Sequence, residues 1–471
     1  MHYVSTRGEA PALGFSDAVL AGLARDGGLY VPDQWPQFSP ADIRAMRGLA
    51  YPDLAIRLLT PFLDGEVQPA VFETLVREAY ATFRHEAVCP LVQLGPNSFV
   101  LELFHGPTLA FKDVAMQLLA RLMDHVLAEQ DRRATIVGAT SGDTGGAAIE
   151  AFAGRERTDV FILFPHGRVS PVQQRQMTTS SAANVHALAI EGNFDDCQGM
   201  LKDMFNDHGF RDRVALSGVN SINWARIMAQ IVYYFSSALS LGSPDRPVSF
   251  TVPTGNFGDI FAGYAAKKMG LPIERLVIAT NDNDILARTL ESGEYRMKGV
   301  VATTSPSMDI QVSSNFERLL FEAGGRNADT VRRYMASLKQ SGAFTIDEKD
   351  LAAIRGDFDA GRATTDEIAA TIRATLERSG YLLDPHTAAG VRVAASHPSG
   401  HPSGATPMIV LGTAHPAKFP AAVEAACGVT PALPAWLADL MQADEKFTVL
   451  PSDLKMVEDY ISHRARAAHQ R

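Results

Sequence analysis

Lys112 is the residue of this chain whose neighbours best suit covalent chemistry. It directly follows three apolar residues, Leu109, Ala110 and Phe111. An amine attacks an aldehyde only in its neutral form, and apolar surroundings oppose the charged form of lysine. The same pattern also fits a lysine whose stem packs on apolar surface while its charged head stays in water. Lys112 is therefore a candidate Schiff-base lysine whose assignment depends on companion motifs.

Three segments downstream of Lys112 have the composition of anion-binding or ligand-binding turns. Residues 138–148 and 252–260 are rich in glycine and lie between an apolar run and a helical pattern, while residues 409–419 begin with an apolar run that ends at Thr413. At the carboxyl end of a strand the chain must turn, and free N–H groups at the next helix start attract a carboxylate or phosphate. These three turns are the candidate ligand site.

Each turn also has an ordinary structural interpretation. Ser141, Asp143 and Thr144 are good N-cap residues for any helix, and Thr413 is compatible with a plain strand-end cap. A hydroxyl at that position can alternatively hydrogen-bond a pyridine nitrogen without holding a proton on it. Residues 252–260 are not a nucleotide P-loop, because the lysine of that pattern is missing, and they lack the third glycine of a dinucleotide fingerprint.

The helices and strands predicted to position these turns are those of an α/β protein. Residues 15–85 show helical spacing and predict a helical N-terminal cap. After residue 90, short apolar runs alternate with helical stretches, which is typical of parallel strands with crossover helices covering both faces. The predicted strands are 99–103, 134–139, 160–164, 185–190, 248–252, 276–279 and 408–411. Residues 324–380 are richer in charge and alanine, which predicts surface helices inserted between strand units.

In this order, a lysine after an apolar run, two anion-binding turns and a strand-end threonine resemble the pyridoxal phosphate enzymes of the tryptophan synthase β-subunit fold. Within that group the chain is similar to the threonine synthase family, in its longer bacterial and fungal branch. The resemblance covers nearly the whole chain. The matching segments are 3–8, 26–32, 105–113, 140–145, 253–259, 308–310, 313–318 and 412–416.

The resemblance implies two open, mostly parallel sheets flanked by helices, with a helical N-terminal cap domain over residues 1–90. The catalytic region is then 91–471. Within it, the resemblance implies a small mobile lobe at about 113–245 and a large lobe at about 246–471. The helical insertion at about 324–380 belongs to the large lobe.

The resemblance also assigns the cofactor-binding residues. Lys112 matches the lysine that forms the Schiff base and then acts as the main acid and base. Thr413 matches the partner of the pyridine nitrogen. Asp143 stands where shorter relatives have an asparagine near the 3-hydroxyl of the cofactor. Its carboxylate, which can only accept hydrogen bonds, departs from the pattern of those relatives. The residues matching the phosphate-binding loop are Gly255, Asn256, Phe257, Gly258 and Asp259.

The residues implied for the substrate come from two further segments. Those matching the cradle of the α-carboxylate are Ser141, Gly142 and Thr144. Arg226, with Asn220 and Ser221 beside it, matches the segment that binds the substrate phosphate, since a phosphorylated substrate needs a cationic anchor. The alternative for Arg226 is a helix-surface arginine in a local ion pair.

The activity implied is that of a lyase of threonine biosynthesis. It converts O-phospho-L-homoserine and water to L-threonine and phosphate by γ-elimination of phosphate and β-addition of water, the last step of that pathway. Three alternatives are a pyridoxal-dependent dehydratase or phospho-lyase, a non-catalytic binder of pyridoxal phosphate or a phospho-ligand, and a kinase. The kinase alternative is disfavoured because the sequence lacks the lysine of a nucleotide P-loop.

The composition of the chain argues against several classes of binding partner. A net charge of −10 with no basic cluster gives no reason to bind nucleic acid or anionic lipid. No apolar stretch has the length of a membrane span or the form of a signal core, so we expect a cytoplasmic enzyme, as monomer or homodimer. Cys89, Cys197 and Cys427 lack the spacing of a zinc site, and no metal is expected. His105 and His415 flank the motif residues; each is either a structural histidine or a pocket residue.

Overall fold

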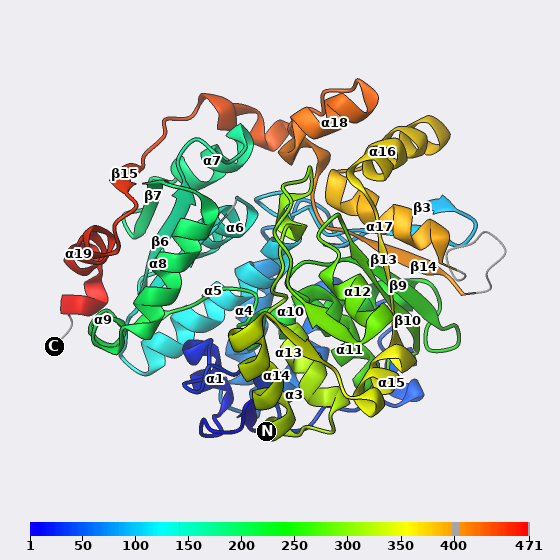
Figure 1. Ribbon diagram of the computed structural model, residues 1–471, viewed down its shortest axis with the longest axis horizontal. Coiled ribbons are helices and arrows are strands. Elements are labelled where there is room, and N and C mark those ends of the chain that lie inside the picture. Colours follow the sequence, from blue (N-terminus) through cyan, green and yellow to red (C-terminus); the bar gives the residue numbers. More distant parts are fainter. Residues whose placement is uncertain (141, 398–405, 470–471) are drawn as a thin grey trace.

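The computed structural model describes residues 1–140, 142–397 and 406–469, and its largest sheet has six strands in the order β13-β10-β9-β14-β4-β3 (Figure 1). The strands are β3 (Leu91–Gly95), β4 (Ser98–Glu102), β9 (Val248–Pro253), β10 (Ile273–Thr280), β13 (Phe358–Arg362) and β14 (Met408–Gly412). All neighbours are parallel except β3, which pairs antiparallel with β4 at one edge.

The second sheet has five parallel strands in the order β15-β7-β6-β5-β8. They are β5 (Ala134–Ala139), β6 (Thr158–Pro165), β7 (Val185–Glu191), β8 (Leu216–Ser217) and β15 (Thr448–Pro451). Every residue of β6 and of β14 is buried. Parallel sheets are covered by helices on both faces, which is why these strands read as continuous apolar runs.

All seven strands predicted from apolar runs are confirmed, as β4, β5, β6, β7, β9, β10 and β14. Helices connect and cover them. The helices of the catalytic region are α5 (Lys112–Glu129), α6 (Asp143–Phe152), α7 (Pro171–Thr178), α8 (Phe194–Asn206), α9 (His208–Arg213), α10 (Trp224–Ser240), α11 (Gly258–Lys268), α12 (Ile285–Ser292), α13 (Phe316–Ala323), α14 (Ala328–Ser341), α15 (Glu348–Asp357), α16 (Thr365–Ser379), α17 (Pro385–Ser396), α18 (Pro420–Cys427) and α19 (Leu454–Arg464).

Helices α5 and α10 connect the two sheets. α5 packs against α6, which follows β5, and against α10; α10 packs in turn against α11, which follows β9. Fourteen of the 17 residues of α10 are buried, as expected for a helix surrounded on all sides. Turns at the carboxyl ends of both sheets are thus held in fixed positions by the same pair of helices.

The N-terminal segment packs on α10. It contains α1 (Phe15–Ala21), α2 (Pro40–Arg44), α3 (Tyr51–Leu63) and α4 (Pro69–Tyr80), with a two-stranded ribbon of β1 (Tyr3–Ser5) and β2 (Tyr30–Pro32). Trp224 is fully buried at the start of α10. Its ring packs against the rings of Tyr3, Trp35 and Phe62, with ring centroids 5.7 to 6.0 Å apart. Buried aromatic contacts of this kind make the cap part of the main core.

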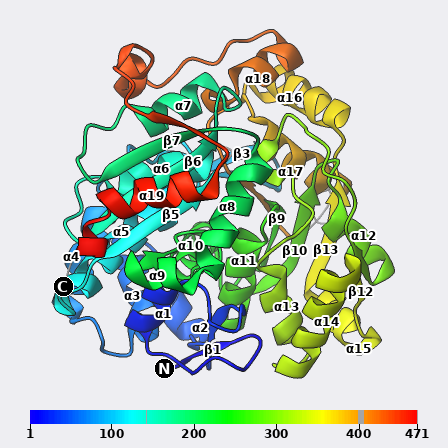
Figure 2. The same ribbon diagram turned by 60° about the vertical axis from the view of Figure 1, so that its left-hand side comes forward.

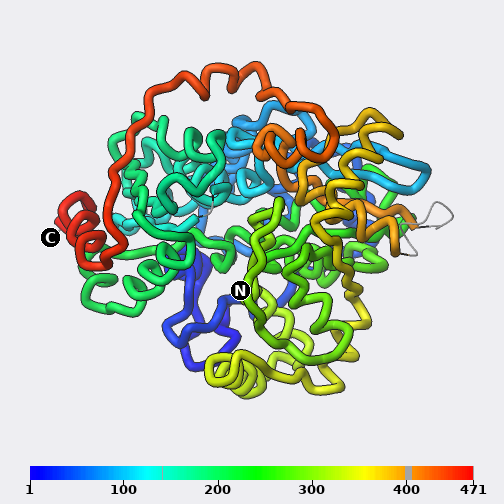
Figure 3. The backbone as a smooth tube through the Cα atoms, turned by 45° about the horizontal axis from the view of Figure 1, so that its top comes forward, coloured from blue at the N-terminus to red at the C-terminus, as the bar shows by residue number. Residues whose placement is uncertain are grey.

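Two segments differ from the expectation. The stretch 324–380 contains α14, α15 and α16, but it also forms β12 (Ala343–Thr345), which pairs with β11 (Glu294–Arg296), and the sheet strand β13. The prediction of surface helices for residues 324–380 is therefore incomplete, because this stretch also contributes two strands. After β14 and α18 the chain crosses from the six-stranded sheet to the five-stranded one, where β15 pairs with β7 at the edge. Figure 3 shows this connection as an arch, and Figure 2 shows β15, in red, alongside β7.

The division into a mobile small lobe and a large lobe stays a prediction. Among the described residues, no helix is long and apolar enough to cross a membrane. Cys89 and Cys197 are buried, whereas Cys427 is only partly so, and none of the three is in a disulfide. The loop at about 395–407, rich in proline and histidine, lies mostly outside the described residues.

Candidate active site

Lys112 and Thr413 are brought together by backbone pairing between two distant segments. Ala110 and Ala414 form an antiparallel bridge, Phe111 N donates to Thr413 O at 2.9 Å, and His415 N donates to Leu109 O at 3.0 Å. Leu109 adopts a left-handed backbone conformation, φ +62°, just before α5 begins at Lys112. The predicted lysine and the predicted strand-end threonine therefore share one wall of the site.

Lys112 is buried at the start of α5, with 8% of its surface exposed. Its Nζ lies 3.4 Å from Asp143 Oδ2. Burial lowers the pKa of Lys112 below its ordinary value; Asp143 opposes this effect, while the charges of Arg226 and Lys418 add to it. The surroundings as a whole therefore shift Lys112 toward the neutral amine that attack on an aldehyde requires.

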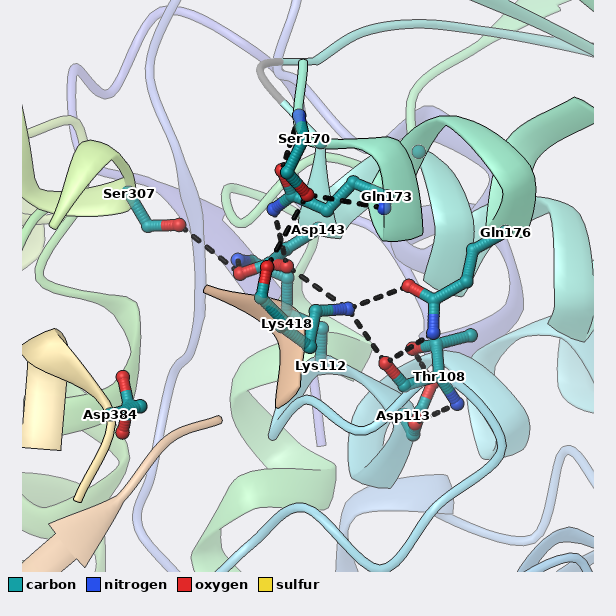
Figure 4. Close-up of polar contacts among 12 residues, drawn as sticks. Thr108, Lys112, Asp113, Asp143, Ser170, Gln173, Gln176, Ser307, Asp384 and Lys418 are labelled. Carbon is teal, nitrogen blue, oxygen red and sulfur yellow. Dashed lines mark hydrogen bonds and ion pairs between the residues drawn. The ribbon is translucent and has the colours of Figure 1, made fainter. Parts of the chain in front are cut away.

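The Asp143 carboxylate is held by four side chains (Figure 4). Besides Lys112, it contacts Lys418 Nζ at 3.1 Å, Gln173 Nε2 at 2.9 Å and Ser307 Oγ at 3.2 Å. Burial alone raises the pKa of Asp143, but Lys418 and Lys112 outweigh it and hold that pKa well below its usual range. Asp143 is consequently an ionised acceptor beside the Lys112 amine.

The first glycine turn is tied down by Thr140. Its Oγ1 accepts from Gly142 N at 2.9 Å and from Gly145 N at 3.1 Å, which satisfies part of the start of α6. Gly142 has φ +145°, and a Cβ there would lie 2.3 Å from the Gln173 side chain. Thr144 is half-buried in the first turn of α6, and the predicted Ser141 lies outside the described residues.

The second glycine turn leads into α11. Phe257, with φ +64°, precedes the helix, and within the described part of the chain no side chain caps the N–H groups of its first turn. The Phe257 ring is in the core against Phe316, so only its backbone can reach a ligand. Gly255 and the exposed Asn256 are held through their carbonyls, by Ser313 Oγ at 2.7 Å and by Asn315 Nδ2 at 2.9 Å respectively. Uncapped N–H groups at a helix start bind anions.

Asp259 differs from its neighbours because its side chain faces α10 and is bound there. Oδ1 accepts from Tyr233 and Tyr234, and the main-chain carbonyl also accepts from Tyr234 Oη at 2.9 Å. Burial raises the pKa of Asp259 to about 7, although the two tyrosines and nearby Arg226 lower it. If Asp259 takes part in holding an anion, its main-chain N–H is the group able to do so.

Arg226 is buried on α10 and close enough to influence both Lys112 and Asp259. Nη1 donates to Val219 O at 3.3 Å, and Nε is buried without a partner among the described residues. This placement excludes the helix-surface alternative. Ser221 lies against the second turn, 3.6 Å from the position of a Cβ on Gly258. The predicted phosphate-binding segment is thus next to the turn at α11.

The Thr413 hydroxyl is available at the carboxyl end of β14. Thr413 is buried and its backbone is engaged, through Thr413 O and through Thr413 N, which donates to Thr387 Oγ1 at 3.2 Å. Its own hydroxyl forms no hydrogen bond within the described part of the chain. A hydroxyl of a buried residue that has no protein partner is suited to bind a ligand atom.

Sequence reasoning missed four groups around this site. Lys418, Gln173, Ser307 and His386 all lie within it, and His386 Nδ1 is 3.0 Å from Asp384 Oδ1 while its Nε2 accepts from Ser307 N at 3.2 Å. Only Lys418 stood inside a segment singled out beforehand. The signal that could have identified it is a lysine five residues after the strand-end threonine, within a run of small and apolar residues.

His105 and His415, which flank the motif residues, form local hydrogen bonds. His105 Nε2 lies 2.7 Å from Glu102 Oε2, and His415 Nδ1 accepts from Ala417 N at 3.1 Å. These contacts favour their structural interpretation over the pocket one. In the described part of the chain, no three histidine, cysteine or carboxylate side chains are grouped so that they could hold a metal ion.

The donor set fits pyridoxal phosphate on three separate counts. Lys112 is buried with a lowered pKa, a helix start presents uncapped N–H groups, and the Thr413 hydroxyl at a strand end has no partner among the described residues. These are the groups needed for an aldehyde, a phosphate and a ring nitrogen respectively. No single one of them is specific, but they converge at the carboxyl ends of neighbouring parallel strands.

Comparison with known proteins agrees with this site. A family model described as pyridoxal-phosphate dependent enzyme matches residues 83–412, so the chain has the fold of a pyridoxal-phosphate-dependent enzyme. Models described as threonine synthase N terminus and threonine synthase, C-terminal, match residues 2–80 and 387–461. The chain belongs to the threonine synthase family.

Individual relatives match over their full length. A threonine synthase of Pseudomonas aeruginosa is 54% identical over 463 residues, covering 98% of each chain. The crystal structure of a PLP-bound threonine synthase from Brucella melitensis is 71% identical, with a TM-score of 0.96 over 99% of this chain and 100% of that one. The yeast threonine synthase structure is 40% identical, with a TM-score of 0.91 over 98% of both chains.

Proposed function

We propose that the site around Lys112 converts O-phospho-L-homoserine and water to L-threonine and phosphate, with pyridoxal phosphate as cofactor. The single observation that carries the residue-level proposal is the pairing of 109–111 with 413–415, which puts a buried lysine and an unpartnered hydroxyl on one wall. Membership of the threonine synthase family supports the reaction.

The residues that would hold the cofactor follow from the groups they offer. Lys112 would bind its aldehyde, the N–H groups at the start of α11 would bind its phosphate, and the Thr413 hydroxyl would bind its ring nitrogen. When bound, this cofactor accepts the electron pair left on a substrate carbon when a proton is removed. Asp143, as a fixed acceptor beside Lys112, would orient the polar edge of the ring.

The substrate would be held between the two glycine turns. The main-chain N–H group of Thr144, at the start of α6, would bind the α-carboxylate. Gly142, whose own N–H is held by Thr140 Oγ1, would let the carboxylate approach the turn closely. Arg226, with its free Nε, would bind the substrate phosphate, and Asn220 and Ser221 would donate beside it. Both anions would then be fixed at opposite ends of the carbon chain that reacts.

Lys112 would carry the protons between the substrate carbons. A neutral amine accepts a proton from the α-carbon, and the flexible lysine stem lets the same nitrogen reach the neighbouring carbons in later steps. Burial of the site would exclude water until the step that consumes it. Phosphate would leave from the γ-carbon and water would add at the β-carbon, so that atoms balance over the reaction.

Reduction with borohydride tests the covalent link. We expect purified protein supplied with pyridoxal phosphate to absorb visible light, to lose that band on reduction and to carry the label on Lys112 in a peptide map. Lys112→Ala should stay unlabelled, while Lys298→Ala, a lysine change outside the site, should label normally. Label on another residue, or none, would exclude this role of Lys112.

Product analysis tests the reaction. Supplied with O-phospho-L-homoserine, the enzyme should release phosphate and threonine in equal amounts, whereas serine or threonine should yield little keto acid. Keto acid as the main product would favour the dehydratase alternative. Finer points of the proposal are a cytoplasmic location and a monomer or homodimer; light scattering of the purified chain decides the oligomeric state.

A further inference from the structure

Lys418 is a second lysine at the site, and its ammonium group is surrounded by hydrogen-bond acceptors. Its side chain has no exposed surface. Nζ donates to Thr108 O at 2.6 Å and to Gln176 Oε1 at 2.8 Å, and it lies 3.1 Å from Asp143 Oδ1. A buried ammonium with three donors needs three acceptors, and Lys418 has them.

The position of Lys418 matters because of the charge on Asp143. Lys112 Nζ is 3.4 Å from Asp143 Oδ2, so an unopposed carboxylate at that distance would stabilise the protonated form of Lys112. That form cannot attack an aldehyde. A carboxylate beside a Schiff-base lysine is therefore compatible with the chemistry only if another charge offsets it.

We infer that Lys418 is a positioning residue that holds the Asp143 carboxylate and offsets its charge, leaving the Lys112 amine neutral. The geometry supports both parts. The two lysine nitrogens engage different oxygens of one carboxylate, and Gln173 donates to Asp143 Oδ1 while Ser307 donates to Oδ2 (Figure 4). This inference rests on the proposed function of Lys112.

The charged groups facing this pair come from several elements. Lys112 is influenced by Asp143 of α6, Arg226 of α10 and Lys418. Asp143 is influenced by both lysines and by His386 of α17. Arg226 also disfavours a proton on Lys112, but Arg226 already interacts with Tyr233 and Asp259. The Asp143 carboxylate opposes the neutral form of Lys112, and Lys418 is bound directly to that carboxylate.

Lys418 also joins distant parts of the chain. It belongs to the short 3₁₀ helix Pro416–Lys418 after β14, whereas its acceptors precede α5 and lie on α6 and α7. Its removal would thus affect both a charge and a set of contacts. The two effects can be separated, because Gln176 shares the contacts and has no charge: Gln176 Nε2 donates to Thr108 O at 3.0 Å.

The test measures the reactivity of the Lys112 amine, independently of turnover. The full-length chain freed of cofactor is incubated with pyridoxal phosphate and cyanoborohydride over a pH series, and the rate of label appearing on Lys112 is read by peptide mass spectrometry. We expect Lys418→Met to raise the midpoint of this pH profile by about one unit, so that labelling near neutral pH slows about tenfold. Gln176→Met should leave the midpoint in place.

The double variant identifies the cause. In Asp143→Asn/Lys418→Met both charges are gone, and the midpoint should return to that of the unsubstituted chain or fall below it. An unchanged midpoint in Lys418→Met overturns the inference, and so does a double variant displaced as far as the single one, because Lys418 would then act through its contacts alone.

Folding of the variants is checked by circular dichroism. If Lys418→Met does not fold, Asp143→Asn is compared with the double variant, since both lack the buried carboxylate. The inference expects the midpoint of Asp143→Asn to be lower by about one unit; equal midpoints overturn it. Absence of any label on Lys112 in the unsubstituted chain overturns the proposed function together with this inference, whereas normal labelling with unmoved midpoints overturns the inference alone.

Discussion

Substituting Asp259 should change how the stability of the protein depends on pH. The carboxylate is buried between Tyr233, Tyr234 and Arg226, and its pKa is raised from 3.8 to about 7, first of all by burial. The folded chain therefore binds this proton more tightly than the unfolded chain does. The stabilisation is fully present at low pH and is lost as the pH rises through about 7.

The size of the effect follows from the two pKa values. Between about pH 5.5 and about pH 8.5, linkage with a folded pKa of about 7 and an unfolded pKa of 3.8 gives a loss of about 2 kcal/mol in the free energy of unfolding. Asp259→Asn keeps an acceptor for the two tyrosines and removes the titration. The pH dependence of the variant should be weaker than that of the unsubstituted chain by this amount.

The assay is urea unfolding of both proteins at the two pH values, followed by circular dichroism. All other titrating groups are shared, so the difference between the two proteins isolates Asp259. Cofactor retention is a second readout. Because the Asp259 side chain is bound by the tyrosines of α10, Asp259→Asn should still bind pyridoxal phosphate. Equal pH dependence in the two proteins would refute the assignment of a raised pKa to Asp259, and loss of the cofactor would refute its orientation.

Three further substitutions test other parts of the structure. Gly142→Ala should raise the KM for the substrate at least about tenfold, because a Cβ at φ +145° would lie 2.3 Å from Gln173; an unchanged KM would show that the turn adapts. Thr413→Val removes the hydroxyl while preserving shape, and should weaken cofactor binding by about 1 kcal/mol, measured by equilibrium titration, with no change in melting temperature. Glu317→Gln, which loses the 2.9 Å ion pair with Arg7, should destabilise the protein by about 2 kcal/mol and expose the N-terminal segment to protease; equal digestion would mean that the cap is held by its apolar contacts alone.

The strands that the sequence predicted correctly are mostly buried. β6 and β14 are buried along their whole length, and such strands need apolar side chains on both faces. The strands that were missed lack that signal. β8 has two residues, β15 is partly exposed at a sheet edge, and β13 contains Asp359 and Gly361. Their pairing depends on a neighbouring strand from a distant segment, which local composition does not encode.

The candidate site divides in the same way. The run before Lys112 and the turn at α11 are local patterns, because a helix start and a strand end are each made by a few consecutive residues. The orientation of Asp259 is not local. Its carboxylate turns to the tyrosines of α10 because that helix packs against α11, a contact set by the core as a whole.

From its residues alone, this sequence determined a lysine suited to covalent chemistry, the two turns that could bind anions and the alternation of strands and helices that carries them. The tertiary structure decided the electrostatics of the site. It placed Lys418, Gln173 and Ser307 around Asp143, from segments up to 275 positions away in the sequence. A buried charge is tolerated only where opposite charges and hydrogen-bond partners converge on it, and that convergence exists only once the distant segments are packed together.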